Sequence, residues 1–338
     1  MVIALPPSSS TALVSAAKRA NLVQGRTSDL AAPNMCLSGH EGAIYCASFE
    51  PIAGNTLATA GLDAKVFLWS VFGECTNFNV LAGHKNAILE MHWLSTGTHL
   101  VTCSADYTAA MWDAAKGCRI KKYVEHTGIV NCCGVAKSNP HMFATGSDDC
   151  TAILWDTRSK TSVATMYHNY QVTSLCMSAD GATVYTGGID NVVRSWDVRH
   201  GDPKKESLSL VGHADTVTGL ALSPDEAILL SNSADSTLRT WDVRPFSANN
   251  TRCMQIFKGL HHGAEKLLLR CAWSPDQSKI SCGSADRCVH IWDVDRGAPL
   301  YILPGHKASV NEAIFHPLQP VICSVSSDRT IFLGELAD

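Results

Sequence analysis

The sequence lacks several features that mark specialised classes of protein. It has no apolar run long enough to span a bilayer, and no basic segment precedes an apolar core at its start, so we expect neither a membrane span nor a secretory signal. Neither sign of charge dominates, because 27 lysines and arginines face 31 aspartates and glutamates. This balance argues against a surface dedicated to the nucleic-acid backbone. The basic clusters at 116–122 and 204–205 are typical of solvated loops, so any RNA contact is expected to be indirect or weak.

Motifs for metals, cofactors and phosphates are also missing. None of the 14 cysteines forms a Cys-x-x-Cys pair, and most lie in strand-like runs, for example Cys46, Cys176 and Cys271. Such cysteines indicate reduced, buried thiols of an intracellular protein, in place of a disulfide framework or a zinc site. The sequence contains no Gly-x-x-x-x-Gly-Lys-Ser/Thr phosphate loop. We therefore expect no metal, no cofactor and no small-molecule substrate.

What the sequence does contain is a short pattern that recurs seven times. In its clearest copy, Thr145 is followed after four positions by Asp149 and after six more by Trp155. A His lies 28 to 30 residues before the last position of each copy, and successive copies are 41 to 51 residues apart. Self-similarity at this period indicates stacked structural repeats.

A recurring His, Ser/Thr and Asp invites comparison with a hydrolase triad, but no mechanism needs the grouping in every repeat with a Trp as fourth member. A structural interpretation accounts for the copies. An imidazole N–H donates to the Asp, the other ring nitrogen meets the hydroxyl, and the hydroxyl meets the indole N–H, so that buried polar groups satisfy one another. The sequence therefore predicts structural tetrads and no catalytic residue. The predicted tetrads are His40, Thr59, Asp63 and Trp69; His84, Thr102, Asp106 and Trp112; His126, Thr145, Asp149 and Trp155; His168, Thr186, Asp190 and Trp196; and His213, Ser231, Asp235 and Trp241.

The last two copies depart from the pattern. In the sixth, Cys282 replaces the hydroxyl residue and His262 is the best candidate for its His. In the seventh, His306 is present but Gly334 stands where the Trp should be. We expect these two repeats to be held less by a polar network and more by packing or by ring closure.

The Gly-His near the start of each repeat and the Trp-Asp at its end resemble the WD40 family, in which each repeat makes one four-stranded propeller blade. The resemblance implies an all-β, seven-bladed propeller over residues 34–338, with its last blade closed by an N-terminal strand at 35–37 beside 330–333. The implied repeats are roughly 39–70, 83–113, 125–156, 167–197, 212–242, 261–293 and 305–336. Residues 1–33 are rich in Ala, Ser and Pro and are expected to be a disordered tail.

Candidate partner-binding residues follow from the same resemblance. In WD40 proteins, the residue before each tetrad Asp and the residue two after each His point to the narrower rim of the ring. Among them we expect Asp148, Tyr170 and Asp215 to be the anchors, because interface hot spots favour aromatic residues and placed charges. Extra residues at 243–252 and 258–268 break the repeat rhythm, and they are either functional loops or neutral drift.

Longer segments carry the resemblance further, among them Trp241-Asp-Val-Arg-Pro-Phe246 and Leu268-Leu-Arg-Cys-Ala-Trp-Ser-Pro-Asp276. They are similar to the WD-repeat subunits of the spliceosomal U5 small nuclear ribonucleoprotein. That resemblance implies a nuclear, non-catalytic scaffold that binds the large U5 protein and other spliceosomal proteins during pre-mRNA splicing, and it adds Arg244 and Phe246 to the candidate contacts. The alternative is a WD40 adaptor of another complex, such as a ubiquitin-ligase substrate receptor or a signalling scaffold. The first would call for a basic rim and the second for a long N-terminal coiled coil.

Overall fold

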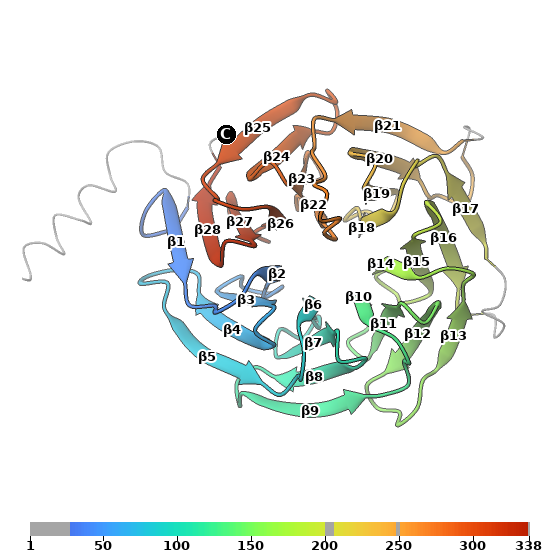
Figure 1. Cartoon of the computed structure of the whole chain (residues 1–338), viewed down its shortest axis with the longest axis horizontal. Coiled ribbons are helices and arrows are strands. Elements are labelled where there is room, and N and C mark those ends of the chain that lie inside the picture. The colour runs from blue at the N-terminus through green and yellow to red at the C-terminus, as the bar shows by residue number, and fades with distance from the viewer. Residues whose placement is uncertain (1–27, 200–205, 248–250, 337–338) are drawn as a thin grey trace, which may run out of the picture.

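The computed structural model describes residues 28–199, 206–247 and 251–336. Every regular element in these ranges is a β-strand, and the strands form seven four-stranded antiparallel sheets. The sheets surround a central axis as the blades of a propeller (Figure 1). The expected all-β, seven-bladed fold is confirmed. Within the described ranges, no helix is long and apolar enough to cross a membrane.

Each blade runs outward from the axis through four strands. The innermost strands are β2 (Ile44–Phe49), β6 (Ile88–Trp93), β10 (Val130–Val135), β14 (Val172–Met177), β18 (Val217–Leu222), β22 (Cys271–Trp273) and β26 (Val310–Phe315). The second strands are β3 (Thr56–Gly61), β7 (His99–Ser104), β11 (Met142–Ser147), β15 (Thr183–Gly188), β19 (Ile228–Ser233), β23 (Lys279–Gly283) and β27 (Val321–Ser326). The third strands are β4 (Lys65–Ser70), β8 (Ala109–Asp113), β12 (Thr151–Asp156), β16 (Val192–Asp197), β20 (Thr237–Asp242), β24 (Cys288–Asp293) and β28 (Thr330–Glu335). The outermost strands are β5 (Asn77–Ala82), β9 (Cys118–Tyr123), β13 (Ala164–Tyr167), β17 (Leu208–Val211), β21 (Cys253–Lys258), β25 (Pro299–Pro304) and β1 (Asn34–Ser38).

The chain enters each innermost strand from one face of the ring and leaves it at the other. We call the first the top face, which carries the Gly-His segments such as 39–43, and the second the bottom face, which carries the turns such as 50–55. In six blades the pairing of the innermost with the second strand shifts register after its first pair, as between Ile44 and Cys46. Such bulges re-aim side chains, and here they lie beside the central channel.

The ring is closed by the two ends of the described chain. Strand β1 pairs antiparallel with β28, with Met35 opposite Leu333 and Ser38 opposite Thr330. This confirms the expected closure. It also leaves the seventh blade with no unpaired edge at β28, which removes a site for unwanted strand pairing.

The segment before β1 differs from the expected tail. Leu30 is only 2% exposed and belongs to the core shared by the first and last blades. The backbone N–H of Ser28 donates to the Glu335 carboxylate, and Asp29 exchanges two hydrogen bonds with Gln319. Residues 28–33 are therefore placed against the propeller, while the rest of the expected tail, residues 1–27, lies outside the described residues.

Candidate interaction sites and the polar networks behind them

The third blade holds a tetrad in the expected arrangement. Nδ1 of His126 lies 2.8 Å from an Asp149 oxygen, Nε2 lies 2.8 Å from the Thr145 hydroxyl, and the Trp155 indole N–H donates to that hydroxyl at 2.8 Å. One proton assignment satisfies the chain: the indole donates to the hydroxyl, the hydroxyl to Nε2, and Nδ1–H to the carboxylate. The same bonds join His40, Thr59, Asp63 and Trp69; His84, Thr102, Asp106 and Trp112; and His213, Ser231, Asp235 and Trp241.

The tetrad carboxylate also organises the turn around it. Asp149 accepts the backbone N–H groups of Thr127 and Thr151, at 2.9 and 3.0 Å. Burial alone would raise the pKa of Asp149, but the hydrogen bonds from His126, Thr151 and Thr127 outweigh it and hold the pKa well below its ordinary value. Each complete tetrad thus links the top-face turn to the indole between blades, and its polar atoms are used internally.

The fourth blade corrects the expected tetrad. The Trp196 indole still donates to Thr186 at 2.8 Å, but Asp190 pairs with Arg194 at 2.6 Å. The buried Nε2 of His168 has no hydrogen-bond partner. Burial, helped by the Arg194 charge, lowers the pKa of His168 to about 4, so this imidazole is neutral. The signal was in the sequence, because Arg194 stands four residues after Asp190 on the strand that follows the turn.

In the sixth blade, as in the fourth, the tetrad Asp pairs with the residue four positions after it, which here is a histidine. Asp286 lies 2.7 Å from Nε2 of His290, and the His290 ring stacks on Trp292. The expected His262 instead contacts the Asn232 amide at 3.4 Å, and its Nδ1 has no partner. His262 is therefore the wrong histidine. The correct one stands four residues after the Asp, as Arg194 does in the fourth blade.

In the seventh blade, three of the four groups are present. His306 lies 3.1 Å from Asp328 and 2.9 Å from the Ser324 hydroxyl. The ring of Phe332 meets the His306 imidazole edge-on at 4.6 Å, while Gly334 pairs with Asn34 of the closing strand. In this blade, which lacks the Trp, the contacts at these positions are aromatic packing by Phe332 and strand pairing with β1.

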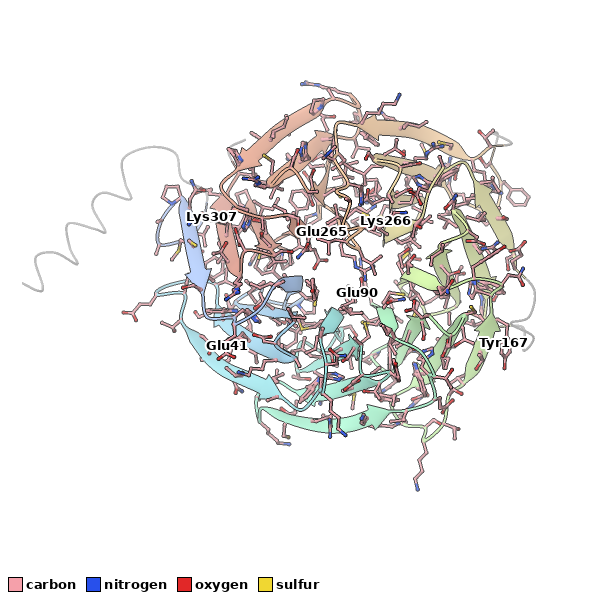
Figure 2. The ribbon with its side chains drawn as sticks, viewed as in Figure 1. Glu41, Glu90, Tyr167, Glu265, Lys266 and Lys307 are labelled. Atoms are coloured by element: carbon pink, nitrogen blue, oxygen red, sulfur yellow. The ribbon has the colours of Figure 1, made fainter. Side chains whose placement is uncertain are left out.

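The sequence pattern did not reveal a cluster of three charged residues at the centre of the ring. Glu90, Arg270 and Glu312 are 6%, 3% and 7% exposed, and Figure 2 shows Glu90 beside the axis. Glu90 and Glu312 directly follow the bulge of their innermost strands. Arg270 occupies the matching position in the sixth blade. The positions that form this ring of residues are Cys46, Glu90, Cys132, Ser174, Gly219, Arg270 and Glu312.

Arg270 reaches across the channel from the sixth blade. Its guanidinium donates to the backbone carbonyls of Asn131, Thr173 and Thr218, which belong to three other blades, at 2.8 to 3.2 Å. It also lies 3.5 Å from the Glu90 carboxylate. Burial by itself would lower the pKa of Arg270, but the nearby acidic groups, Glu90 first, raise it above its ordinary value. We call Glu90, Arg270 and Glu312 the hub.

The two hub carboxylates bridge neighbouring blades in the same way. Glu90 accepts the backbone N–H of Cys133 at 2.9 Å, and Glu312 accepts that of Ala47 at 2.7 Å. Their environments differ, because Glu90 has the Arg270 guanidinium nearby whereas no ion pair to Glu312 is formed within the described ranges. Burial raises the pKa of Glu312 to about 7.

The candidate rim residues fall into two groups. Tyr170 is 54% exposed at the top face, and Ile189 of the same blade is 46% exposed beside the turn that Tyr170 belongs to. Asp148 accepts a hydrogen bond from the Asn131 amide at 2.6 Å, and Asp215 accepts the N–H of Thr216 at 2.7 Å. Tyr170 therefore offers the largest unengaged side chain of the expected anchors, while the two carboxylates already shape their own turns.

Arg244 and Phe246 also differ, because the Arg244 side chain is bonded within its turn and the Phe246 side chain is exposed. The Arg244 guanidinium makes a bidentate pair with Asp242, at 2.9 and 2.8 Å, and Asp156 and Arg158 make the same pair two blades earlier. The repeated geometry indicates a turn-stabilising role for Arg244. Phe246 is 95% exposed, the highest fraction among the large apolar side chains that the structure describes.

The repeats match a known family. The family model described as "WD domain, G-beta repeat" matches seven segments of this chain, at residues 32–70, 75–113, 117–156, 160–197, 204–242, 252–293 and 297–333. The chain belongs to the WD40-repeat family.

Relatives of this WD40 protein are similar over nearly its whole length. The U5 small nuclear ribonucleoprotein 40 kDa protein of Dictyostelium discoideum is 50% identical over 311 residues, which cover 92% of this chain and 86% of that protein. The protein of the same description from Homo sapiens is 48% identical with the same coverage. The pre-mRNA-splicing factor cwf17 of Schizosaccharomyces pombe is 45% identical over 92% of this chain and 90% of that protein. These matches confirm the resemblance to the WD-repeat subunits of the U5 particle.

One further group in the WD40 ring has donors of the kind that bind metals. Single ligand atoms of Glu90, His92 and Cys133 lie within 4.8 Å of one another. The Glu90 carboxylate is already held by Arg270 and by a backbone N–H. A hydrogen bond with the Cys103 thiol, together with burial, raises the pKa of Cys133 well above its ordinary value and so opposes the thiolate that a metal needs. Glu90, His92 and Cys133 are therefore poorly suited to bind a metal, and the Glu90 carboxylate serves the hub instead.

Proposed function

We propose that this WD40 protein is a scaffold subunit of the U5 small nuclear ribonucleoprotein, without a reaction of its own, and that it acts in the nucleus in pre-mRNA splicing. The observation that carries the proposal is the 45–50% identity, over 92% of the chain, to proteins named as U5 components and as a splicing factor. The proposed partners are the large U5 protein and other spliceosomal proteins, with RNA reached through them.

The chemistry of the ring supports a binding role. In the groupings that resemble catalytic triads, the donors and acceptors form hydrogen bonds with one another and with nearby turns, as in the third blade. Propeller blades held in this way present fixed rims, and rigid surfaces lose little conformational entropy when a partner binds.

Two exposed places are the proposed partner contacts. At the top face these are Tyr170 and Ile189, about half exposed and in one blade. After the fifth blade it is Phe246, whose ring is almost fully exposed. Aromatic side chains of this kind are enriched among interface hot spots. Asp148, Asp215 and Arg244 stay candidate contacts, although their side chains are also bonded within their own blades.

The proposal is tested by affinity purification of the tagged full chain from nuclear extract under nuclease treatment, followed by mass spectrometry. We expect the large U5 protein to be recovered by the wild-type chain and to be reduced severalfold by Tyr170→Ala with Ile189→Ser, or by Phe246→Ser. The matched control is Phe78→Ser, which removes a ring that is 57% exposed on the outermost strand β5.

Failure to recover any spliceosomal protein with a folded wild-type chain would overturn the proposed function. Recovery of ubiquitin-ligase or signalling components in their place would favour a WD40 adaptor of another complex. Full recovery with both surface variants would be consistent with the proposed function and would show that the partner contact lies elsewhere on the chain.

A further inference from the structure

The channel below the hub opens into a funnel on the bottom face. The funnel has a volume of about 530 Å³, which lies within the range of ligand pockets, roughly 300–1,000 Å³. Its floor is the hub itself, formed by Glu90, Arg270 and Glu312. Its mouth lies among the turns that follow the innermost strands, where Pro51 and Pro317 line it.

The wall of the funnel is mostly apolar. Several innermost strands, and the residues just after them, turn large apolar side chains toward it, and the largest are Phe49, Met177, Leu222, Trp273 and Phe315. Such a wall favours an aliphatic or aromatic segment, because burial of apolar surface is the main gain of binding there.

The floor offers a carboxylate, that of Glu312, which forms no ion pair among the described residues, although Lys137 and His92 also line the funnel. Arg270 directs its donors to three backbone carbonyls and lies near Glu90, so its charge is already engaged. Glu312 receives one hydrogen bond, from Ala47, through a single carboxylate oxygen. The burial that raises the pKa of Glu312 to about 7 reflects the cost of holding this carboxylate unpaired.

We propose that the funnel binds a lysine side chain presented by an apolar segment of a partner protein, with the ammonium at Glu312 and the aliphatic stem along the wall. A lysine fits better than an arginine. The Ala47 N–H already uses one acceptor position of the Glu312 carboxylate, which restricts the approach of a two-pronged guanidinium more than that of an ammonium, which needs only a point contact. The cavity exceeds one side chain in size, so neighbouring apolar residues of the segment fill the remainder. The site goes beyond the proposed function, since it does not depend on which complex supplies the segment.

The test uses the full chain and capped tripeptides as probes, titrated by isothermal calorimetry at pH 8. The probes are acetyl-Leu-Lys-Leu-amide, its norleucine counterpart, which keeps the stem without the charge, and its arginine counterpart. We expect the lysine peptide to bind at least about tenfold more tightly than the other two, which corresponds to one decade in Kd. Glu312→Gln should remove that advantage while leaving the norleucine peptide unchanged. The control Glu74→Gln, an exposed carboxylate on the bottom face, should change neither affinity.

A second measurement needs no variant. In the wild-type chain labelled with ¹³C at glutamate carboxyls and held at pH 6.5, below the raised pKa of Glu312, the lysine peptide should shift the Glu312 resonance toward its ionised position. Equal affinity for the lysine and norleucine peptides would overturn the proposal, as would no binding at millimolar concentration. An arginine peptide that binds as tightly as the lysine peptide would overturn the choice of lysine.

Discussion

The buried carboxylate of Glu312 should make the stability of the propeller depend on pH in a direction that the structure fixes. Burial raises the pKa of Glu312 from the ordinary 4.5 to about 7. Below the ordinary value the group is protonated in both the folded and the unfolded chain, and stability is unaffected. Between the two values the unfolded chain loses the proton and the folded chain keeps it, so stability falls as pH rises and levels off above the folded pKa.

The magnitude follows from the size of the shift. A rise from 4.5 to about 7 corresponds to roughly 3 kcal/mol at about 1.4 kcal/mol for each pH unit. Glu312→Gln removes the titration, and its amide oxygen can still accept the Ala47 N–H. The free energy of unfolding of the variant relative to wild type should therefore rise by about 2 kcal/mol between pH 5 and pH 8.

Urea denaturation followed by tryptophan fluorescence at several pH values measures this difference. The slope with denaturant should stay constant, so that a change in midpoint reports stability alone. Glu74→Gln, on the exposed part of the bottom face, should give a flat difference across the same range. If the Glu312→Gln difference is equally flat, the carboxylate titrates as it does in water, and the account of an unpaired buried charge is wrong.

Five further substitutions probe the polar networks, each measured by chemical denaturation. Trp155→Ala should cost roughly 3–5 kcal/mol and Asp149→Ala about 1–3 kcal/mol, and losses below about 0.5 kcal/mol for both would contradict the tetrad. His126→Leu should cost about 1–3 kcal/mol, whereas His168→Leu should be near neutral because its buried nitrogen has no partner to lose; equal costs would show that His168 is bonded after all. Arg270→Met should cost about 3–5 kcal/mol by leaving Glu90 unpaired, and a stable variant would mean that the hub does not hold the blades together.

Much of the fold could be predicted because the repeat averages out local ambiguity. A single run such as Ile44–Phe49 could be a strand or part of a buried helix, but the same run at seven equivalent places leaves one architecture. The closure by β1 was expected from the resemblance to WD40 propellers, in which an N-terminal strand completes the last blade. The tail boundary was misplaced because Leu30, a lone apolar residue among small ones, carries no periodic signal.

The errors in the tetrads come from competition that spacing cannot show. His168 keeps the expected distance from Trp196 along the chain, yet Arg194 takes the carboxylate of Asp190. Asp190 lies in the turn and Arg194 on the strand that follows it, so a charged residue four after the Asp is a competitor that could be read from the sequence. The competitor does not always win. Arg239 stands at the same position in the fifth blade, 4.0 Å from Asp235, and His213 keeps its bond there.

The hub shows why a cavity with a charged floor can be absent from a repeat pattern. Glu90, Arg270 and Glu312 come from three repeats and meet only when the ring closes. Aligning the repeats would have placed all three at one position, where the remaining blades have small residues and cysteine. A charge at that position is unusual because it must be buried, and the ring tolerates three because Arg270 is bonded to carbonyls of three other blades. The same cluster leaves the Glu312 carboxylate without an ion pair among the described residues at the floor of the funnel. Stability and binding should therefore respond oppositely to Glu312→Gln: the loss of charge that strengthens the fold above pH 7 should weaken the hold on a cationic segment.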